Sequence, residues 1–388
     1  MSSTKKKVGI ITLVKVGNYG AELQAFALQR ALNTMGFDAE IIDYPYFTNP
    51  RHKVVKESRP SFELSYKSRF IHILFPLYSH LKKFLCNLRV LRVRKDRFDS
   101  FHKKNTRFSI EYRSIIDLFS ANMDYDIYVV GSDQVWNPNN YTSLDPYFLK
   151  FAPKEARKIS YASSFGVSFL PEESKDYFSC ALKGLDAVSV REENAVRLVE
   201  EVSGIKAECV LDPSFLLSKD DWNQIAHHIN GIPDKYVLLY EVTPCPYLYS
   251  LAAFIARQND FKIVKIERDA SYSWRKGDYV SIKDAGPAEF VWAFAHASFV
   301  VTNSFHGIAF SLIMNKDFFV VTPRRKQNNS RQVSLLNRFG LENRLIVENA
   351  SLENINGIKS INYSLVSRIM EEQKVKSINF LNTSMNGE

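Results

Sequence analysis

Short apolar runs alternate with helical patterns along most of the chain. In the first half, runs at 8–14, 39–43, 125–130, 158–162, 187–190 and 209–211 predict five or six strands, each followed by polar residues or glycine. Between the first two strands, the pattern from Ala21 to Leu32 predicts a helix that ends before Gly36. This order is typical of a doubly wound α/β domain with a parallel sheet.

A second series of strands begins after a break. Runs at 236–241, 261–266, 299–302 and 317–322 predict strands, and the apolar run 308–314 predicts a crossover helix between the last two. Because 388 residues exceed what a single core usually supports, we expect two such domains facing a cleft. The expected division is 1–214 and 215–360, followed by a helix and tail at 361–388 that can cross back to the first domain.

The charge is concentrated in one segment. Residues 67–107 carry twelve basic and two acidic residues, a net +10, whereas the whole chain carries +9. Apolar residues recur there at helical spacing, which predicts a basic amphipathic helical insertion at about 50–110 of the first domain. Two interpretations stay open, docking on an anionic membrane surface or packing against the protein body. Nucleic acid is not indicated, because neither a known binding fold nor interleaved stacking aromatics is present.

The cysteines and the lengths of the apolar runs indicate the cellular compartment and whether a metal site is expected. The four cysteines, Cys86, Cys180, Cys209 and Cys245, are scattered without a C-x-x-C pair, so we expect reduced thiols, no disulfide framework and no metal site. The first apolar run, 8–14, is too short for a signal peptide, and no run reaches the length of a membrane span. We therefore expect a cytoplasmic protein, held at the inner face of the membrane if the insertion docks there.

The candidate chemistry lies at the ends of two predicted strands. His306 follows the strand at 299–302, and four cations, Arg324, Arg325, Lys326 and Arg331, follow the strand at 317–322. Carboxyl ends of parallel strands meet at one edge, where open α/β sheets bind ligands. A titratable imidazole beside several cations suits a small anionic substrate that gains or loses a proton. The plainer interpretation is a hydrogen-bonded loop histidine beside a solvated basic surface.

The first loop, Gly17–Gly20, precedes a helix but is neither G-x-G-x-x-G nor a Walker loop. No nucleotide cofactor is therefore predicted. We interpret this loop first as a tight turn and second as a surface for an acceptor, through Asn18, Tyr19 and Glu22. After the strand at 125–130, Asp133 and Trp136 are further candidates for acceptor contact. A loop-capping carboxylate and a core indole are the alternatives.

Five ordered motifs together resemble one known family, the polysaccharide pyruvyl transferases. The motifs are GNYGAELQAFALQ at 17–29, GSDQVWN at 131–137, SVREE at 189–193, LDPS at 211–214 and TNSFHG at 302–307. The resemblance runs from about residue 8 to 344 and omits most of the basic insertion. It implies two Rossmann-like domains similar to GT-B glycosyltransferases. The implied reaction transfers the enolpyruvyl carbons of phosphoenolpyruvate to a saccharide as a cyclic ketal, and we expect the saccharide acceptor to be lipid-linked.

The resemblance also implies roles for particular residues. An arginine, a histidine and a lysine associated with donor binding and catalysis in the family correspond here to Arg191, His306 and Lys326. Arg324 or Arg325 could take the place of Lys326, and Ser304 is a further candidate for donor binding. Many relatives have an arginine at the position of Ser304, and Arg331 is the candidate to replace that arginine. The alternatives are a nucleotide-sugar glycosyltransferase of the same shape and a non-catalytic scaffold of polysaccharide assembly.

Overall fold

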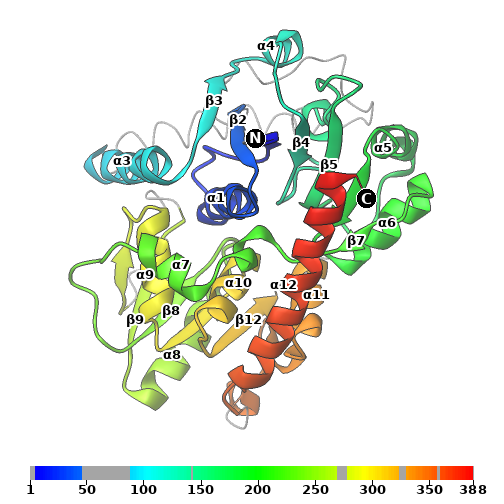
Figure 1. The fold of residues 1–388 in the computed structure, drawn as a ribbon. Helices are drawn as coiled ribbons and strands as arrows, with labels where there is room; N and C mark the ends of the chain where they lie inside the picture. The colour runs from blue at the N-terminus through cyan, green and yellow to red at the C-terminus, as the bar shows by residue number, and fades with distance from the viewer. Residues whose placement is uncertain are drawn as a thin grey trace, which may run out of the picture.

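Two parallel β-sheets, each wrapped by helices, form the body of the protein (Figure 1). The computed structural model describes residues 5–45, 88–140, 143–268, 278–322, 329–355 and 359–387. The predicted strands and crossover helices are present in both halves of the chain, and the architecture of two doubly wound α/β domains is confirmed.

The first sheet has seven strands in the order β3-β2-β1-β4-β5-β6-β7, and all of its paired strands run parallel. Its strands are β1 Lys7–Ile11, β2 Asp38–Asp43, β3 Phe108–Glu111, β4 Ile127–Val130, β5 Arg157–Ser163, β6 Ala187–Val190 and β7 Glu208–Cys209. Its helices are α1 Tyr19–Thr34, α3 Leu88–Asn105, α4 Ile115–Ser120, α5 Lys175–Leu182 and α6 Glu193–Ser203, with 3-10 helices at Asp145–Phe148 and Glu172–Ser174. The order of the strands reverses between β1 and β4, the usual place for a ligand in such a sheet.

The second sheet has six parallel strands in the order β10-β9-β8-β11-β12-β13. Its strands are β8 Tyr236–Tyr240, β9 Lys262–Ile266, β10 Val280–Ile282, β11 Phe299–Thr302, β12 Phe318–Thr322 and β13 Leu345–Val347. Its helices are α7 Lys219–Ile225, α8 Pro246–Asn259, α9 Pro287–His296, α10 Phe305–Ile313 and α11 Ser330–Arg338, with 3-10 helices at Glu342–Arg344 and Leu352–Ile355. Here the order reverses between β8 and β11, which places His306 at the turning point.

Helix α1 lies between the two sheets and is buried on both sides. Ala25, Leu28 and Leu32 pack in the core of the first sheet. Leu23 and Phe26 belong instead to the core of the second domain. The two domains therefore share one continuous apolar interface through this helix, which fixes their carboxyl edges against each other.

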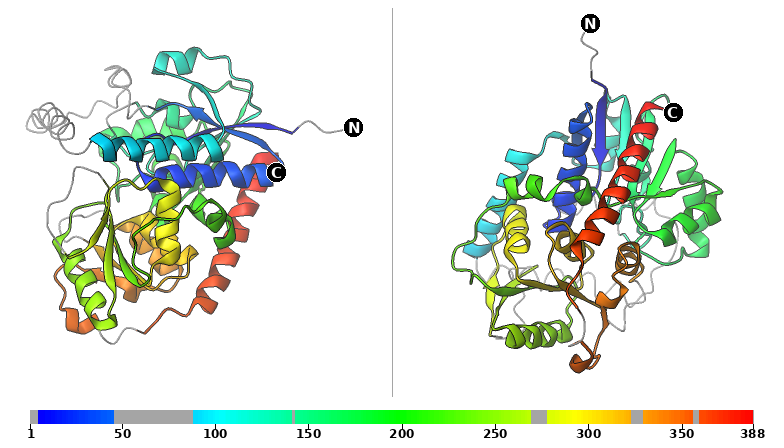
Figure 2. Two further views of the ribbon diagram at one scale, coloured as in Figure 1. Left: turned by 90° about the vertical axis from the view of Figure 1, so that its left-hand side faces the viewer. Right: turned by 60° about the horizontal axis from the view of Figure 1, so that its bottom comes forward.

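Helix α3, the described part of the basic insertion, packs across both domains (Figure 2). Phe98 and Phe101 enter the core that α1 shares with the second domain. The Arg94 guanidinium donates hydrogen bonds of 2.8 Å to the carbonyls of Glu267 and Arg268. The 88–105 part of the insertion is thus a structural element. The basic residues at 67–83 lie outside the described residues.

Helix α12, Tyr363–Asn386, begins beside the second domain and ends on the first (Figures 1 and 2). Phe380, Leu381 and Met385 pack in the core of the first sheet. The Ser377 hydroxyl also accepts a 2.9 Å hydrogen bond from the Leu211 amide. This helix ties the end of the second domain back to the linker at 210–218.

Three short edge strands were not predicted, β3, β10 and β13. Each has three or four residues, so alternation of apolar and polar positions is too brief to stand out. Strand β3 also falls at the end of the interval expected for the basic insertion. It pairs with β2 and forms the edge strand on that side of the sheet.

Candidate functional site

The functional residues expected from strand ends come together between the two sheets. Arg191 directly follows β6, and Asp212 follows β7 and precedes the 3-10 helix Pro213–Leu216. From the other domain, His306 lies in the first turn of α10, directly after β11. The carboxyl edges of the two sheets therefore face each other, and charged side chains from both edges meet at the interface.

His306 sits in a narrow space between a glycine and a carboxylate of the first domain. Its Nε2 is 3.6 Å from Asp212 Oδ2, an ion-pair distance slightly too long for a hydrogen bond. On the other side, a Cβ added to Gly20 would lie 2.0 Å from His306 Nδ1. Only glycine at position 20 lets the ring approach this closely. His306 is 7% exposed, so the ring is shielded from bulk water.

Arg191 is held by carboxylates and by an aromatic ring. Its guanidinium lies 2.9 Å from Asp212 Oδ2 and 3.4 Å from Asp133 Oδ1. The guanidinium carbon lies 4.1 Å from the centre of the Phe305 ring, which belongs to the second domain. The neighbouring Glu192 is also buried and accepts a 2.7 Å hydrogen bond from Ser164.

Burial and the neighbouring charges shift the pKa values of Glu192, Asp212 and Arg331. Burial raises the pKa of Glu192, although Arg191 and the Ser164 hydrogen bond act against this rise. Burial would also raise the pKa of Asp212, but His306 and Arg191 outweigh it and hold that pKa well below its usual range. For Arg331, burial and the repulsion from Arg191 both lower the pKa.

Several buried polar atoms of this group have no hydrogen-bond partner among the described residues. They are Arg191 Nε, Glu192 Oε2, His306 Nε2, Arg331 Nε and Gln332 Oε1. Buried polar groups in folded proteins are almost always paired, so a concentration of unpaired donors and acceptors indicates a place for a ligand. Donors from both domains contribute, and two of them belong to arginines that can bind carboxylate or phosphate.

The other predicted donor residues fall in two groups. Arg324, Arg325 and Lys326 lie outside the described residues. Ser304 is buried at the start of α10, where its amide donates a 3.1 Å hydrogen bond to Thr302 Oγ1. Arg331 lies in the first turn of α11, close enough to Arg191, Glu192 and Asp133 for their charges to act on its pKa.

The expected acceptor residues are mostly structural. Tyr19 is 1% exposed, and its hydroxyl donates a 3.2 Å hydrogen bond to the Ala285 carbonyl of the second domain. Trp136 is fully buried, stacks on Phe148 and donates to the Tyr147 carbonyl. Neither ring therefore has a free face for a sugar in this structure.

The polar acceptor candidates also have local partners. Glu22 accepts hydrogen bonds from the amides of Lys15 and Val16 and contacts His102 of α3 at 2.9 Å, which holds the loop before α1. Asp133 accepts from the Gln134 amide as well as contacting Arg191. Asn18 caps α1 by accepting from the Gly20 amide, and it remains exposed to solvent.

Sequence reasoning missed the parts played by Gly20, Glu192 and Asp212. Each belongs to one of the ordered motifs, so the motifs marked their positions. The contact of Gly20 and Asp212 with His306 crosses between domains and leaves no local pattern.

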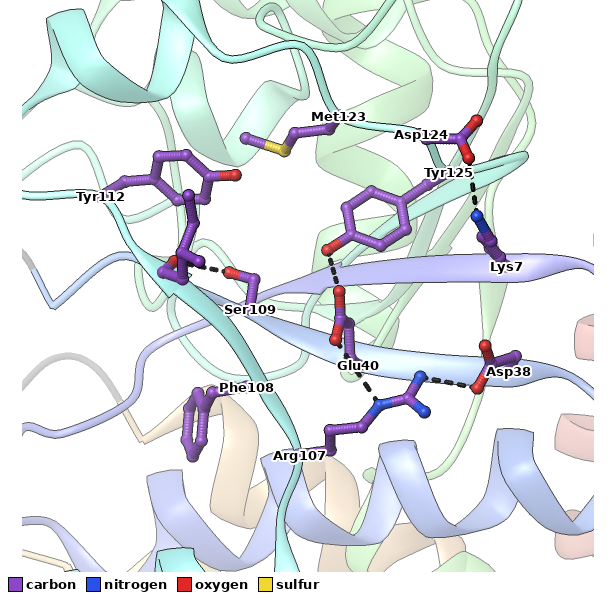
Figure 3. A pocket seen from close by; sticks show the side chains of 11 residues that line it. Lys7, Asp38, Glu40, Arg107, Phe108, Ser109, Tyr112, Met123, Asp124 and Tyr125 are labelled. Carbon is purple, nitrogen blue, oxygen red and sulfur yellow. Dashed lines mark hydrogen bonds and ion pairs between the residues drawn. The ribbon is translucent and has the colours of Figure 1, made fainter.

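A separate open pocket of about 530 Å³ lies at the opposite, amino-terminal edge of the first sheet (Figure 3). Its lining has three carboxylates, Asp38, Glu40 and Asp124, and two cations, Lys7 and Arg107. Lys7 pairs with Asp124 at 2.6 Å, and Arg107 pairs with Asp38 at 2.6 Å. Because its two cations are already paired, this pocket is a poor candidate for an anionic substrate.

The described residues hold no group of three or more His, Cys, Asp or Glu side chains placed to bind a metal ion. In the same part of the chain, no helix combines the length and the apolarity that crossing a bilayer requires.

Comparison with solved structures shows a fold class, the two-domain GT-B-like fold. Arabidopsis thaliana UGT89C1 is similar at 10% sequence identity and a TM-score of 0.50, covering 97% of this chain and 98% of that one. The UDP-GlcNAc 2-epimerase of Methanocaldococcus jannaschii, solved with UDP-GlcNAc and UDP, is similar at 14% identity and a TM-score of 0.46, covering 95% and 99%. At 10% identity, the likeness to UGT89C1 shows a shared fold alone.

Sequence comparison then gives the family. The sequence model of the polysaccharide pyruvyl transferases matches residues 18–325, and the chain belongs to this family. Comparison with curated protein sequences gave no match. The matched range includes Arg191, Asp212 and His306, and it ends before Arg331.

Proposed function

We propose that the protein transfers the enolpyruvyl group of phosphoenolpyruvate to a saccharide as a cyclic pyruvate ketal. Family membership supports pyruvyl transfer to a polysaccharide or its precursor. The observation that carries the choice of donor is the pair of buried Nε atoms of Arg191 and Arg331, which have no hydrogen-bond partner among the described residues. Phosphoenolpyruvate has a carboxylate and a phosphate, which two arginines from opposite domains can bind.

The proposed chemistry begins with a proton transfer. His306 donates a proton to the methylene carbon of phosphoenolpyruvate, which becomes a methyl group, and the adjoining carbon becomes electrophilic. A first sugar hydroxyl forms a bond to this carbon and returns its proton to His306. A second hydroxyl forms the other bond as the carbon–oxygen bond to phosphate breaks, and its proton leaves with the phosphate. The products are the cyclic ketal and inorganic phosphate, and His306 ends in its starting form.

In this proposal the residues have separate tasks. Arg191 and Arg331 bind the two anionic ends of the donor. Lys326, or Arg324 or Arg325 in its place, is expected to assist; these three residues lie outside the described part of the chain. Burial of His306 and Arg191 excludes water, which would otherwise compete with the sugar hydroxyls. The reaction as written uses no metal ion and no cofactor.

We also propose that the acceptor is lipid-linked and that α3 helps to hold the enzyme at the cytoplasmic face of the membrane. One side of α3 is used in protein contacts, including those of Arg94 and Phe98. The exposed residues of α3 include five basic side chains, Arg89, Arg92, Lys95, Lys103 and Lys104, and two acidic ones, Asp96 and Asp99. Each basic residue near an anionic leaflet contributes about 1 kcal/mol, and the two acidic residues act against it, so this helix would give weak, reversible binding.

The test is to incubate the purified protein with phosphoenolpyruvate and a panel of lipid-linked or model glycosides. We expect release of inorganic phosphate, together with a glycan whose mass has increased by a pyruvate ketal. Transfer of a sugar from a nucleotide sugar, without use of phosphoenolpyruvate, would support a glycosyltransferase instead. If no donor is consumed and His306→Ala leaves glycan modification in cells unchanged, the scaffold alternative would stand.

A further inference from the structure

In the motif Leu211–Ser214, the two carboxylate oxygens of Asp212 have different hydrogen-bond partners. Asp212 Oδ1 accepts from the Ser214 amide at 3.0 Å and from the Ser214 hydroxyl at 2.7 Å. Asp212 Oδ2 accepts from Arg191 at 2.9 Å and from the Ser132 hydroxyl at 3.2 Å. The side chain is almost fully buried, so its orientation is fixed by these four donors.

The same Oδ2 oxygen is the one that reaches the second domain. It lies 3.6 Å from His306 Nε2, and Asp212 is the acidic residue that pairs with His306 in the described structure. Capping the short helix at Pro213 uses Oδ1 alone. A role limited to that cap would not explain why Oδ2 is directed between Arg191 and His306.

Gly20 limits the movement of the imidazole from the other side. Since a Cβ at this position would come within 2.0 Å of Nδ1, the ring is confined between the start of α1 and Asp212. Both confining groups belong to the first domain, whereas His306 belongs to the second. His306 has these neighbours only when the two domains are apposed as in this structure.

We propose that Asp212 is the positioning residue for His306, so that the acid–base group of the reaction is an Asp212–His306 pair assembled from both domains. This inference rests on the proposed function and adds to it a residue that acts through His306. A fixed carboxylate orients the imidazole and stabilises it when it carries a proton. The low pKa of Asp212, which results from His306 and Arg191 outweighing burial, keeps the carboxylate ionised for this task.

The first test is a double-mutant cycle of Asp212→Asn and His306→Ala, followed through kcat for phosphate release. Asp212→Asn alone should lower kcat by about tenfold or more, within the range of coupling between residues in contact. In the His306→Ala background the same change should lower kcat by less than about twofold, because the group through which Asp212 acts is absent.

Asp133→Asn is the matched control, since Asp133 also contacts Arg191 but is not paired with His306. Its effect on kcat should be the same with and without His306. If Asp212→Asn is unstable, Ser214→Ala removes one donor to Oδ1 and keeps the charge. That variant should lower kcat several-fold with His306 and not without it. An Asp212→Asn effect of equal size in both backgrounds would overturn the proposal and leave pyruvyl transfer standing.

A second readout does not depend on activity. In protein labelled with 15N-histidine, the His306 imidazole resonances are assigned by their loss in His306→Ala. We expect Asp212→Asn to shift them and Asp133→Asn to leave them nearly in place. Unchanged His306 resonances in Asp212→Asn would refute the pair even if no acceptor has been found. Failure of the proposed function would instead appear as the absence of phosphate release by the wild type.

Discussion

We predict that Arg331 lowers the free energy of unfolding of the protein without ligand and raises the affinity for phosphoenolpyruvate. Its Nε is buried without a hydrogen-bond partner among the described residues, and burial and Arg191 both lower its pKa. Arg331→Met keeps most of the side-chain volume and removes the charge. The side chain as a whole is half-buried, and Glu192 and Asp133 partly offset the cost of its charge. Because a buried Nε without a partner is still costly, the free energy of unfolding should stay the same or rise by up to about 2 kcal/mol.

Donor affinity should change in the opposite direction. Loss of a charge-assisted hydrogen bond to phosphoenolpyruvate costs about 1.5–3 kcal/mol, which corresponds to a roughly 10- to 150-fold increase in Kd. The affinity is measured by titration calorimetry and the stability by urea unfolding of the protein without ligand. If Arg331 is a binding residue, Arg331→Met should be at least as stable as the wild type and should bind phosphoenolpyruvate more weakly.

Arg94→Met provides the contrast, because Arg94 is a buried arginine with partners. It donates to two carbonyls of the second domain and stacks on Tyr19 at 4.8 Å. Its loss leaves those carbonyls unpaired and should destabilise the protein by about 2–4 kcal/mol. If Arg331→Met destabilises the protein to the same degree and binds phosphoenolpyruvate normally, Arg331 has a structural role and does not belong to the donor site.

Three further predictions concern the same interface and the basic helix. Gly20→Ala should lower kcat to nearly the level of His306→Ala, because the added Cβ would displace the imidazole. The control is Gly184→Ala, whose Cβ would come no closer than 3.3 Å to another atom, and its kcat should be close to that of the wild type. His306→Ala should lower kcat by roughly a hundredfold or more with unchanged circular dichroism, and near wild-type turnover would remove His306 from the mechanism. The protein should sediment with anionic liposomes at low salt and be released at high salt, and replacing Arg89, Arg92, Lys103 and Lys104 by glutamine should weaken sedimentation; a wild type that ignores such liposomes would contradict membrane docking.

Residues at strand ends were predictable because the relation between a strand and its following loop is local. His306 was expected from its place after an apolar run, and Arg191, which the family resemblance indicated, also follows a strand. Parallel topology brings such positions to one edge of a sheet. The Asp212–His306 contact was not predictable in this way, since it depends on how two separate sheets face each other.

The burial of Tyr19, which we expected at an acceptor surface, was not predictable for a related reason. A helix with one apolar face would have left the start of α1 exposed. However, thirteen of the sixteen residues of α1 are buried, because the second domain covers the side that the first sheet leaves open. Apolar residues around the whole helix, among them Leu23, Phe26 and Leu28, are the signal that could have indicated burial on both sides.

Donor identity is the central claim, and direct binding tests it without knowledge of the acceptor. Titration calorimetry of the wild type should show saturable binding of phosphoenolpyruvate, weakened in Arg191→Ala and in Arg331→Met, and no comparable binding of a nucleotide sugar. Tight binding of a nucleotide sugar together with no binding of phosphoenolpyruvate would contradict the account.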